Sequence, residues 1–110
     1  MQASAHSYAT GTNYRVMNFS SITDGTSNTL SYVECAARPD LFRMGRLISA
    51  NSVAASGWCD SENEIGLDGC NNGGTPGIQA MNCTNRGEPY AFHTGGINVA
   101  LCDGSVRFMR

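Results

Sequence analysis

A histidine and an aspartate near the end of the chain, His93 and Asp103, are residue types that act together as catalytic dyads. Nine residues separate them, and ten extended steps of the backbone span about 33 Å at roughly 3.3 Å per residue. Gly95 and Gly96 can bend the chain, but they cannot fold one strand back onto itself. We therefore expect Asp103 to serve a turn and His93 to hydrogen-bond a neighbouring loop or a backbone carbonyl, and we predict no catalytic residues.

A second polar cluster runs from Asp24 to Asn28 and could supply a nucleophile or ligands for a cation. No second base lies near it in the sequence, and Asp, Asn, Ser and Thr side chains often bond to their own backbone in tight loops. We interpret the cluster as a structural loop. Glu34 follows it near the end of an expected strand, where its carboxylate is expected to hold the loop through backbone N–H groups.

A long polar segment, residues 60–76, offers oxygen ligands at short spacing, the chemistry that Ca²⁺ prefers. The candidate ligands are Asp60, Glu62, Glu64 and Asp68. The Asp-x-Asp-x-Asp-Gly run of an EF-hand is missing, so we favour a solvated acidic surface loop. Calcium binding by this loop stays open as the alternative, and no other metal or cofactor is expected.

The five cysteines are dispersed, and none of them forms a Cys-x-x-Cys pair of the kind found in zinc ribbons and thioredoxins. In a small, turn-rich chain this pattern indicates disulfides made in an oxidising compartment. Cys59 and Cys70 bracket a polar loop that has little to bury, and a disulfide between them is our first expectation. Cys83–Cys102 is the next choice, which leaves Cys35 unpaired, although spacing alone does not determine the connectivity.

A chain of 110 residues with 41% hydrophobic residues can form one domain with a modest core. A formal net charge of −2 argues against nucleic-acid binding. No apolar stretch approaches the roughly 18 residues that span a membrane, and the first residues do not have the pattern of a signal peptide.

The remaining pattern favours an α+β or mainly β domain with an antiparallel sheet. Alternation and β-branched residues predict a strand over residues 29–35. Residues 40–55 are the only segment whose composition favours a helix, but Gly45 lowers its helix propensity, so we expect a short helix or an irregular loop there. We also expect short strands at 14–19 and 78–83, turns at 20–28 and 85–88, and the final strands within 90–110.

The last strands are expected to form a hairpin around Asp103-Gly104, a pair that suits a two-residue type I′ turn. This turn would pair Leu101 with Val106 and Val99 with Phe108. Five apolar side chains would then share one face of the sheet, namely Ile97, Val99, Leu101, Val106 and Phe108.

The same segment resembles a known family. His93, nine intervening residues and Asp103-Gly104 are similar to the H-X9-DG tail of prepilin-type proteins of the DUF1559 family. Residues 22–30 with Glu34 form a second match, and residues 82–85 form a weaker third one. The resemblance marks these residues as its structural motif: Asp24, Gly25, Ser27, Asn28, Glu34, His93, Gly96, Asp103 and Gly104.

The resemblance implies that residues 1–110 form one pilin-like globular head, with the family's prepilin cleavage site and hydrophobic N-terminal helix absent. It implies a fold and a setting but no reaction, and because no constellation of residues supports catalysis we expect the protein not to be an enzyme. The expected protein is structural, pilin-like or pseudopilin-like and related to type II secretion, at the cell envelope or outside the cell. Its partners would be other pilin-like subunits or the secretion or pilus machinery, and it would meet the membrane only through the missing helix. The alternative is a secreted binding module whose 60–76 loop takes a cation, a glycan or a protein.

Overall fold

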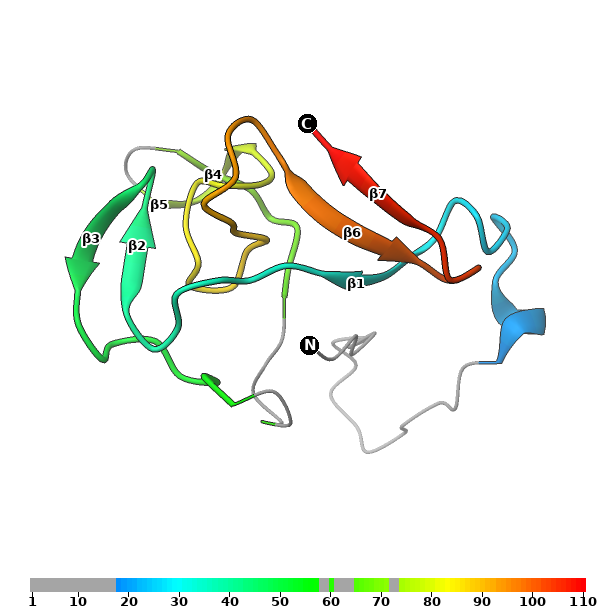
Figure 1. Cartoon of the computed structure of the whole chain (residues 1–110), viewed down its shortest axis with the longest axis horizontal. Coiled ribbons are helices and arrows are strands. Elements are labelled where there is room, and N and C mark those ends of the chain that lie inside the picture. Colours follow the sequence, from blue (N-terminus) through cyan, green and yellow to red (C-terminus); the bar gives the residue numbers. More distant parts are fainter. Residues whose placement is uncertain (1–17, 58–59, 61–64, 72–73) are drawn as a thin grey trace.

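The computed structural model describes residues 18–57, 60, 65–71 and 74–110. Within these ranges its regular secondary structure consists almost entirely of short antiparallel strands, joined by turns and irregular segments (Figure 1). The elements are η1 (Phe19–Ser21), β1 (Leu30–Val33), β2 (Leu41–Arg43), β3 (Arg46–Ser49), β4 (Cys70–Asn71), β5 (Gly74–Gln79), β6 (Ile97–Leu101) and β7 (Val106–Met109). The mainly β form of the predicted fold class is confirmed. No described helix has the length and apolar character needed to cross a membrane.

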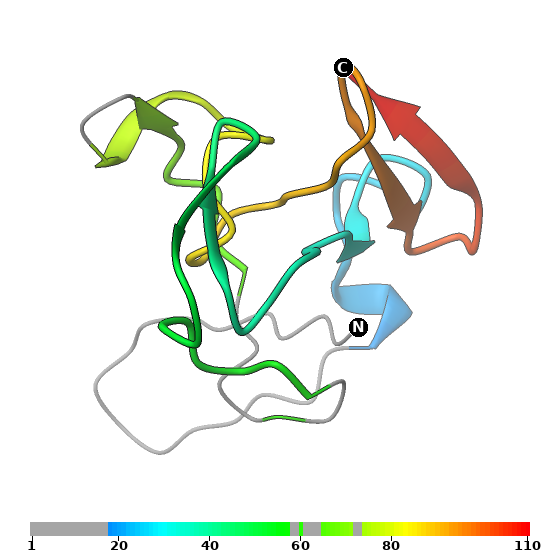
Figure 2. The same cartoon turned by 60° about the vertical axis from the view of Figure 1, so that its left-hand side comes forward.

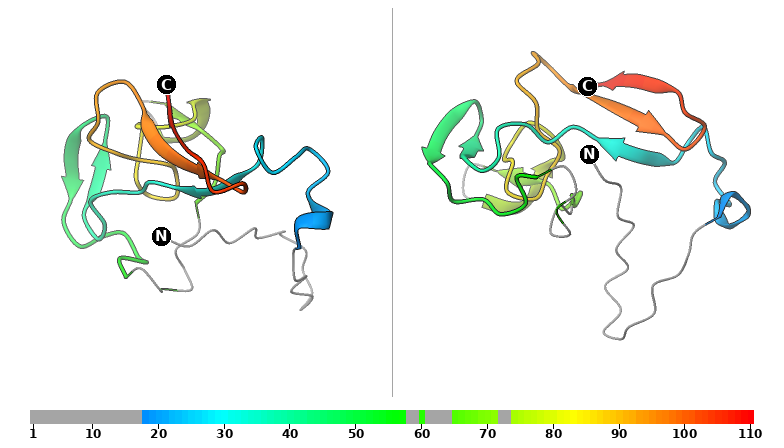
Figure 3. Two further views of the ribbon diagram at one scale, coloured as in Figure 1. Left: turned by 45° about the vertical axis from the view of Figure 1, so that its right-hand side comes forward. Right: turned by 60° about the horizontal axis from the view of Figure 1, so that its bottom comes forward.

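The main sheet has the strand order β1-β6-β7, so a strand from the first half of the chain pairs with the C-terminal hairpin (Figures 1 and 3). In β6 the alternate residues Ile97, Val99 and Leu101 are buried, as period-two geometry requires. Ile97 and Val99 form the core with Ala91, and partly buried Val33 and Met81 pack against it. The strand predicted over residues 29–35 is therefore confirmed as β1.

The C-terminal hairpin exists, but its predicted register is wrong by one residue. Val99 pairs with Arg107 and Asn98 with Phe108, which places Phe108 on the opposite face from Ile97 and leaves it 46% exposed. The cause is the turn, in which the N–H of Leu101 donates to the carbonyl of Ser105 across a three-residue loop (2.9 Å). Gly104 takes the positive φ (84°) typical of such loops, whereas a type I′ turn needs positive φ at two central residues.

Residues 40–55 contain a β-hairpin where a short helix or an irregular loop was expected. Met44 and Gly45 both have positive φ (48° and 79°), so they form a two-residue turn whose twist matches the flanking strands β2 and β3. Phe42 on β2 packs edge-on against Phe92, with ring centroids 5.2 Å apart. The hairpin is thereby joined to the segment that precedes β6.

A third hairpin, β4–β5, occupies the second half of the predicted 60–76 loop, so β5 begins before the strand expected at 78–83 and ends at Gln79. The hairpin brings Cys70 beside Cys83, and these two residues form a disulfide with Cα atoms 5.9 Å apart. The predicted pairings Cys59–Cys70 and Cys83–Cys102 are therefore wrong. Cys102 is free because it lies at the far end of β6, where its N–H donates to the carbonyl of Thr29 (2.9 Å).

Cys35 is unpaired, as expected, whereas Cys59 lies outside the described residues. The predicted strand at 14–19 also falls mostly outside them, and its last residue, Phe19, belongs to η1. Figure 2 shows the main sheet on one side of the molecule and the two smaller hairpins on the other, with residues 80–92 running between them. This middle segment bonds to both sides: the N–H of Met44 donates to the carbonyl of Cys83 (2.8 Å), and the amide of Asn82 donates to the carbonyl of Gly96 (2.8 Å).

Candidate functional site

Three residues from the two long motif segments, Glu34, His93 and Asn98, meet on the outer face of the main sheet. Because Val33 pairs with Val99 in antiparallel register, Glu34 at the end of β1 comes to lie opposite Asn98 in β6. The Glu34 carboxylate accepts the backbone N–H of Asn98 at 2.7 Å and its side-chain amide at 3.0 Å. His93 Nε2 lies 3.4 Å from Glu34 Oε1 and 3.3 Å from Asn98 Nδ2. We call Glu34, His93 and Asn98 the carboxylate clamp.

The role expected of Glu34 is thereby corrected, since its carboxylate binds the C-terminal motif and not the Asp24 loop. Burial by itself raises the pKa of Glu34, but hydrogen bonds from Asn98 and His93 outweigh it, and the pKa is lowered. His93 bonds a carboxylate and an amide, whereas a loop or a backbone carbonyl was expected. Its ring also packs edge-on against Phe108, with the centroids 6.3 Å apart.

Gly96 is required beside the clamp because there is no room for a side chain. A Cβ atom at this position would overlap the carbonyl of Met109 in β7 and approach the ring of Phe108. Any larger residue would push β7 away from β6. Asn82, from the third motif match, binds the carbonyl of Gly96 through its amide (2.8 Å) and so fixes this approach.

The loop over residues 24–28 holds itself together and also holds the C-terminal turn. The Asn28 amide donates to the carbonyl of Asp24 at 3.0 Å, and Gly25 takes a positive φ of 86°, while Ser27 is exposed. The carbonyl of Thr26 accepts the N–H of Asp103 at 3.2 Å. The two long motifs are therefore joined at both ends of β6.

Asp103 lies in the turn at the opposite end of β6 from His93. Its carboxylate accepts the N–H of Ser105 at 2.9 Å and the hydroxyl of Ser105 at 2.7 Å, and these two bonds lower its pKa. Because each side chain bonds a different set of neighbours, the structure does not bring His93 and Asp103 together.

The acidic residues proposed as calcium ligands are only partly covered. Asp60 and Asp68 are described, whereas Glu62 and Glu64 lie outside the described residues. Within residues 18–57, 60, 65–71 and 74–110, no group of three or more His, Cys, Asp or Glu side chains is arranged to hold a metal ion.

Comparison with known proteins supports one family. The model of the family described as "Protein of unknown function (DUF1559)" matches residues 2–110. The chain belongs to this family. No curated protein and no solved structure matches it.

In this DUF1559 domain the carboxylate clamp is arranged to hold strands together. Glu34 is ionised at neutral pH, and its carboxylate accepts two hydrogen bonds from Asn98, so it is a weak base. The contacts connect β1 to β6 and fix the turn that carries His93. The clamp is thus suited to holding the strands of the sheet in register. Its hydrogen bonds involve a charged carboxylate, and such bonds are roughly twice as strong as those between neutral groups.

Sequence reasoning missed Asn85, a buried residue of the DUF1559 domain whose side chain makes three hydrogen bonds. It is fully buried, its Oδ1 accepts the N–H of Phe42 (2.8 Å), and its Nδ2 donates to the carbonyls of Ala36 (3.0 Å) and Asp40 (2.8 Å). Its own carbonyl accepts Nε of Arg38 at 3.0 Å. The only sequence signal was the weak family match over residues 82–85, which gave no indication of this role.

The substitution Glu34→Gln should lower the free energy of unfolding at pH 7 by about 1–2 kcal/mol, because hydrogen bonds to a charged group are replaced by neutral ones. The pKa of Glu34 is lowered in the folded state, so this stabilisation is present above the unfolded pKa, near 4.5, and is lost as the pH falls through the folded pKa. Urea unfolding of both proteins at pH 7 and at pH 3 measures it. We expect the difference to shrink at pH 3; a difference that is absent at pH 7 or unchanged at pH 3 contradicts the role of the clamp.

Proposed function

We propose that this DUF1559 domain is the globular head of a type IV pilin-like or pseudopilin-like protein. It acts as a non-catalytic structural or interaction protein at the cell envelope or outside the cell. The observation that carries the proposal is the mutual bonding of the two long family motifs. Glu34 binds Asn98 at one end of β6, and Thr26 binds Asp103 at the other, so the motif residues build the sheet.

The Cys70–Cys83 disulfide supports the proposed location, because structural disulfides persist in oxidising compartments outside the cytosol. Attachment to the membrane would occur through a hydrophobic helix that precedes the head in the complete gene product. A net charge of −2 gives no attraction to nucleic acid, in keeping with protein partners.

The outer face of the main sheet supports an interaction role. Tyr32 pairs with Ala100, and Ala100 pairs with Val106, so Tyr32 and Val106 lie on the same face, together with Phe108. All three large side chains are exposed, and Val106 is 68% exposed. Apolar side chains gathered on one exposed face are typical of protein contacts, and the proposed partners are other pilin-like subunits or the secretion or pilus machinery.

The proposal is tested in the source cells with the complete gene. The upstream sequence should encode a prepilin cleavage site followed by about 20 apolar residues. A photo-crosslinking amino acid at Val106 should give adducts with pilin-like or secretion subunits in the sheared cell-surface fraction. The same group at Ile78, an apolar position on β5 that is even more exposed than Val106, is the control. An upstream sequence without the cleavage site, or equal crosslinking from both positions, overturns the proposal.

A further inference from the structure

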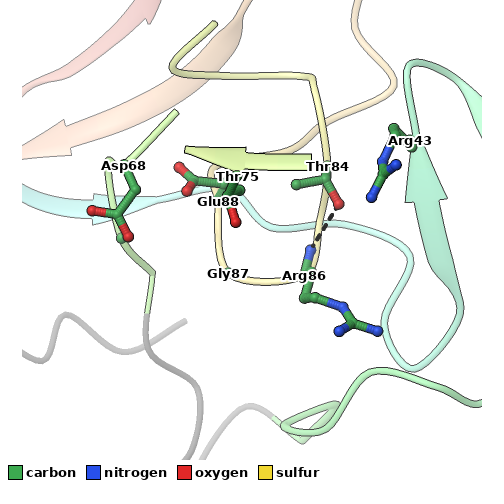
Figure 4. A pocket seen from close by; sticks show the side chains of 8 residues that line it. Arg43, Asp68, Thr75, Thr84, Arg86, Gly87 and Glu88 are labelled. Atoms are coloured by element: carbon green, nitrogen blue, oxygen red, sulfur yellow. Dashed lines mark hydrogen bonds between the residues drawn. The ribbon is translucent and has the colours of Figure 1, made fainter. Parts of the chain in front are cut away.

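A cavity of about 290 Å³ lies between the β4–β5 hairpin and the segment over residues 84–88 (Figure 4). It is separate from the carboxylate clamp. Its walls are joined by backbone hydrogen bonds, since the N–H of Gly66 donates to the carbonyl of Gly87 (2.6 Å) and the N–H of Gly77 donates to that of Asp68 (3.3 Å). The cavity is therefore formed by three segments that are distant in sequence and fixed to one another.

The cavity is lined by a buried carboxylate that the fold leaves incompletely bonded. Glu88 is only 3% exposed, and within the described part of the chain its Oε2 atom is buried without a hydrogen-bond partner. Burial raises the pKa of Glu88, and the nearby Asp68 carboxylate adds to this, although the N–H groups of Gly69 and Asp68 act in the opposite direction. A buried carboxylate oxygen without a partner is costly, so this site favours a bound donor.

Opposite charges line the two sides of the same cavity. Figure 4 shows Asp68 and Glu88 toward one side and Arg86 and Arg43 toward the other, with Thr75 and Thr84 between them. Among the described residues, the guanidinium group of Arg86 forms no ion pair with either carboxylate. The carboxylates on the acidic side of the cavity are thus not neutralised by Arg86 on the other side.

We propose that this cavity binds a small dipolar ligand of the amino-acid type. The ammonium group of the ligand lies beside the carboxylate side chains of Asp68 and Glu88, while its carboxylate is bound by Arg86. A volume of about 290 Å³ has room for a molecule of this size. A divalent cation fits less well, because no three metal-ligating side chains gather among the described residues and arginines share the space. The proposal goes beyond the structural role of the domain and is independent of it.

The binding experiment varies the charges of the probe. Isothermal titration calorimetry of the oxidised protein at pH 7 uses glycine, β-alanine and γ-aminobutyrate, whose charged groups are progressively further apart. Ethylamine and acetate carry only one of the two charges each. We expect at least one dipolar probe to bind roughly tenfold or more tightly than both single-charge probes. No binding by any dipolar probe, or equal binding by acetate or ethylamine, overturns the proposal.

Substitutions in the cavity then test which residues bind the probe. Asp68→Asn and Arg86→Gln change exposed side chains, so folding is not at risk, and each should weaken binding of the best probe about tenfold. Arg107→Gln, an exposed arginine on β7, is the matched control and should leave binding unchanged. Unchanged binding in both Asp68→Asn and Arg86→Gln overturns the assignment.

Glu88→Gln separates a binding role from a structural one. Removing a buried charge that has one oxygen, Oε2, without a hydrogen-bond partner should leave the midpoint of urea unfolding equal or higher, while the best dipolar probe loses at least tenfold in affinity. A variant that is clearly less stable and still binds normally shows that Glu88 serves the fold, and it contradicts the proposal.

Discussion

Replacement of Asn85 by alanine should lower the free energy of unfolding by about 3–5 kcal/mol, enough to unfold much of a domain of this size. The substitution leaves the N–H of Phe42 and the carbonyls of Ala36 and Asp40 without the amide that bonds them. Each buried group left without a partner costs about 1–3 kcal/mol, and the fully buried side chain also leaves a cavity. Urea unfolding followed by circular dichroism measures the change.

Asn28→Ala is the matched control for this prediction. Its amide makes one hydrogen bond to the carbonyl of Asp24 at an exposed position, so we expect a loss below about 1 kcal/mol. Asn85→Asp adds a second comparison, because it retains the acceptor for Phe42 but replaces the donor to Ala36 and Asp40 by a carboxylate. Asn85→Asp should therefore be as destabilising as Asn85→Ala. A loss in Asn85→Ala no larger than in Asn28→Ala would show that Asn85 does not hold residues 36–42 against the middle segment.

The main sheet could be predicted from the sequence because its signal is local. Alternation over residues 29–35 and 97–101 identifies β1 and β6, and the burial of Ile97, Val99 and Leu101 follows from the same period. The register of β7 could not be predicted correctly. A two-residue and a three-residue turn are both compatible with Asp103-Gly104, and one residue of difference moves Phe108 to the other face.

The hairpin β2–β3 could not be predicted from the sequence for a different reason. Met44 adopts positive φ, which is uncommon for a residue other than glycine, asparagine or aspartate, so the turn has no clear signature in the sequence. Tertiary contacts support it: the hydroxyl of Tyr90 accepts the N–H of Gly45 at 3.1 Å, and the N–H of Met44 donates to the carbonyl of Cys83 at 2.8 Å. Such partners are distant in sequence, and propensity alone does not predict them.

Some residues of the candidate sites could be predicted from the sequence, and others could be found only in the structure. The motif residues were identified by their resemblance to a family, but Glu34 was assigned to the nearer loop because its true partner, Asn98, lies 64 residues away. Glu88 was not identified as a site residue. Nothing in its local sequence shows that it is buried, and a buried carboxylate is detected only once the hairpin β4–β5 and residues 84–88 lie side by side.

Removal of the Cys70–Cys83 disulfide should cost about 3 kcal/mol, the value expected when a crosslink closing a loop of roughly 15 residues is lost. The two cysteines are separated by 13 positions and both are fully buried, so their crosslink fixes β4–β5 against the middle segment. Peptide mapping of the unreduced protein should recover Cys70 joined to Cys83. The double variant Cys70→Ser/Cys83→Ser should unfold at a clearly lower urea concentration than the native protein.

Cys102→Ser is the matched control for the disulfide, since Cys102 is free and its main-chain bond to Thr29 does not depend on the thiol. We expect this variant to change stability by less than about 1 kcal/mol. Because the cavity that contains Glu88 adjoins the tethered hairpin, the double variant should also lose affinity for the dipolar probes, whereas Cys102→Ser should retain it. A peptide map that joins Cys59 to Cys70, or equal stability of the double variant and the native protein, contradicts the prediction.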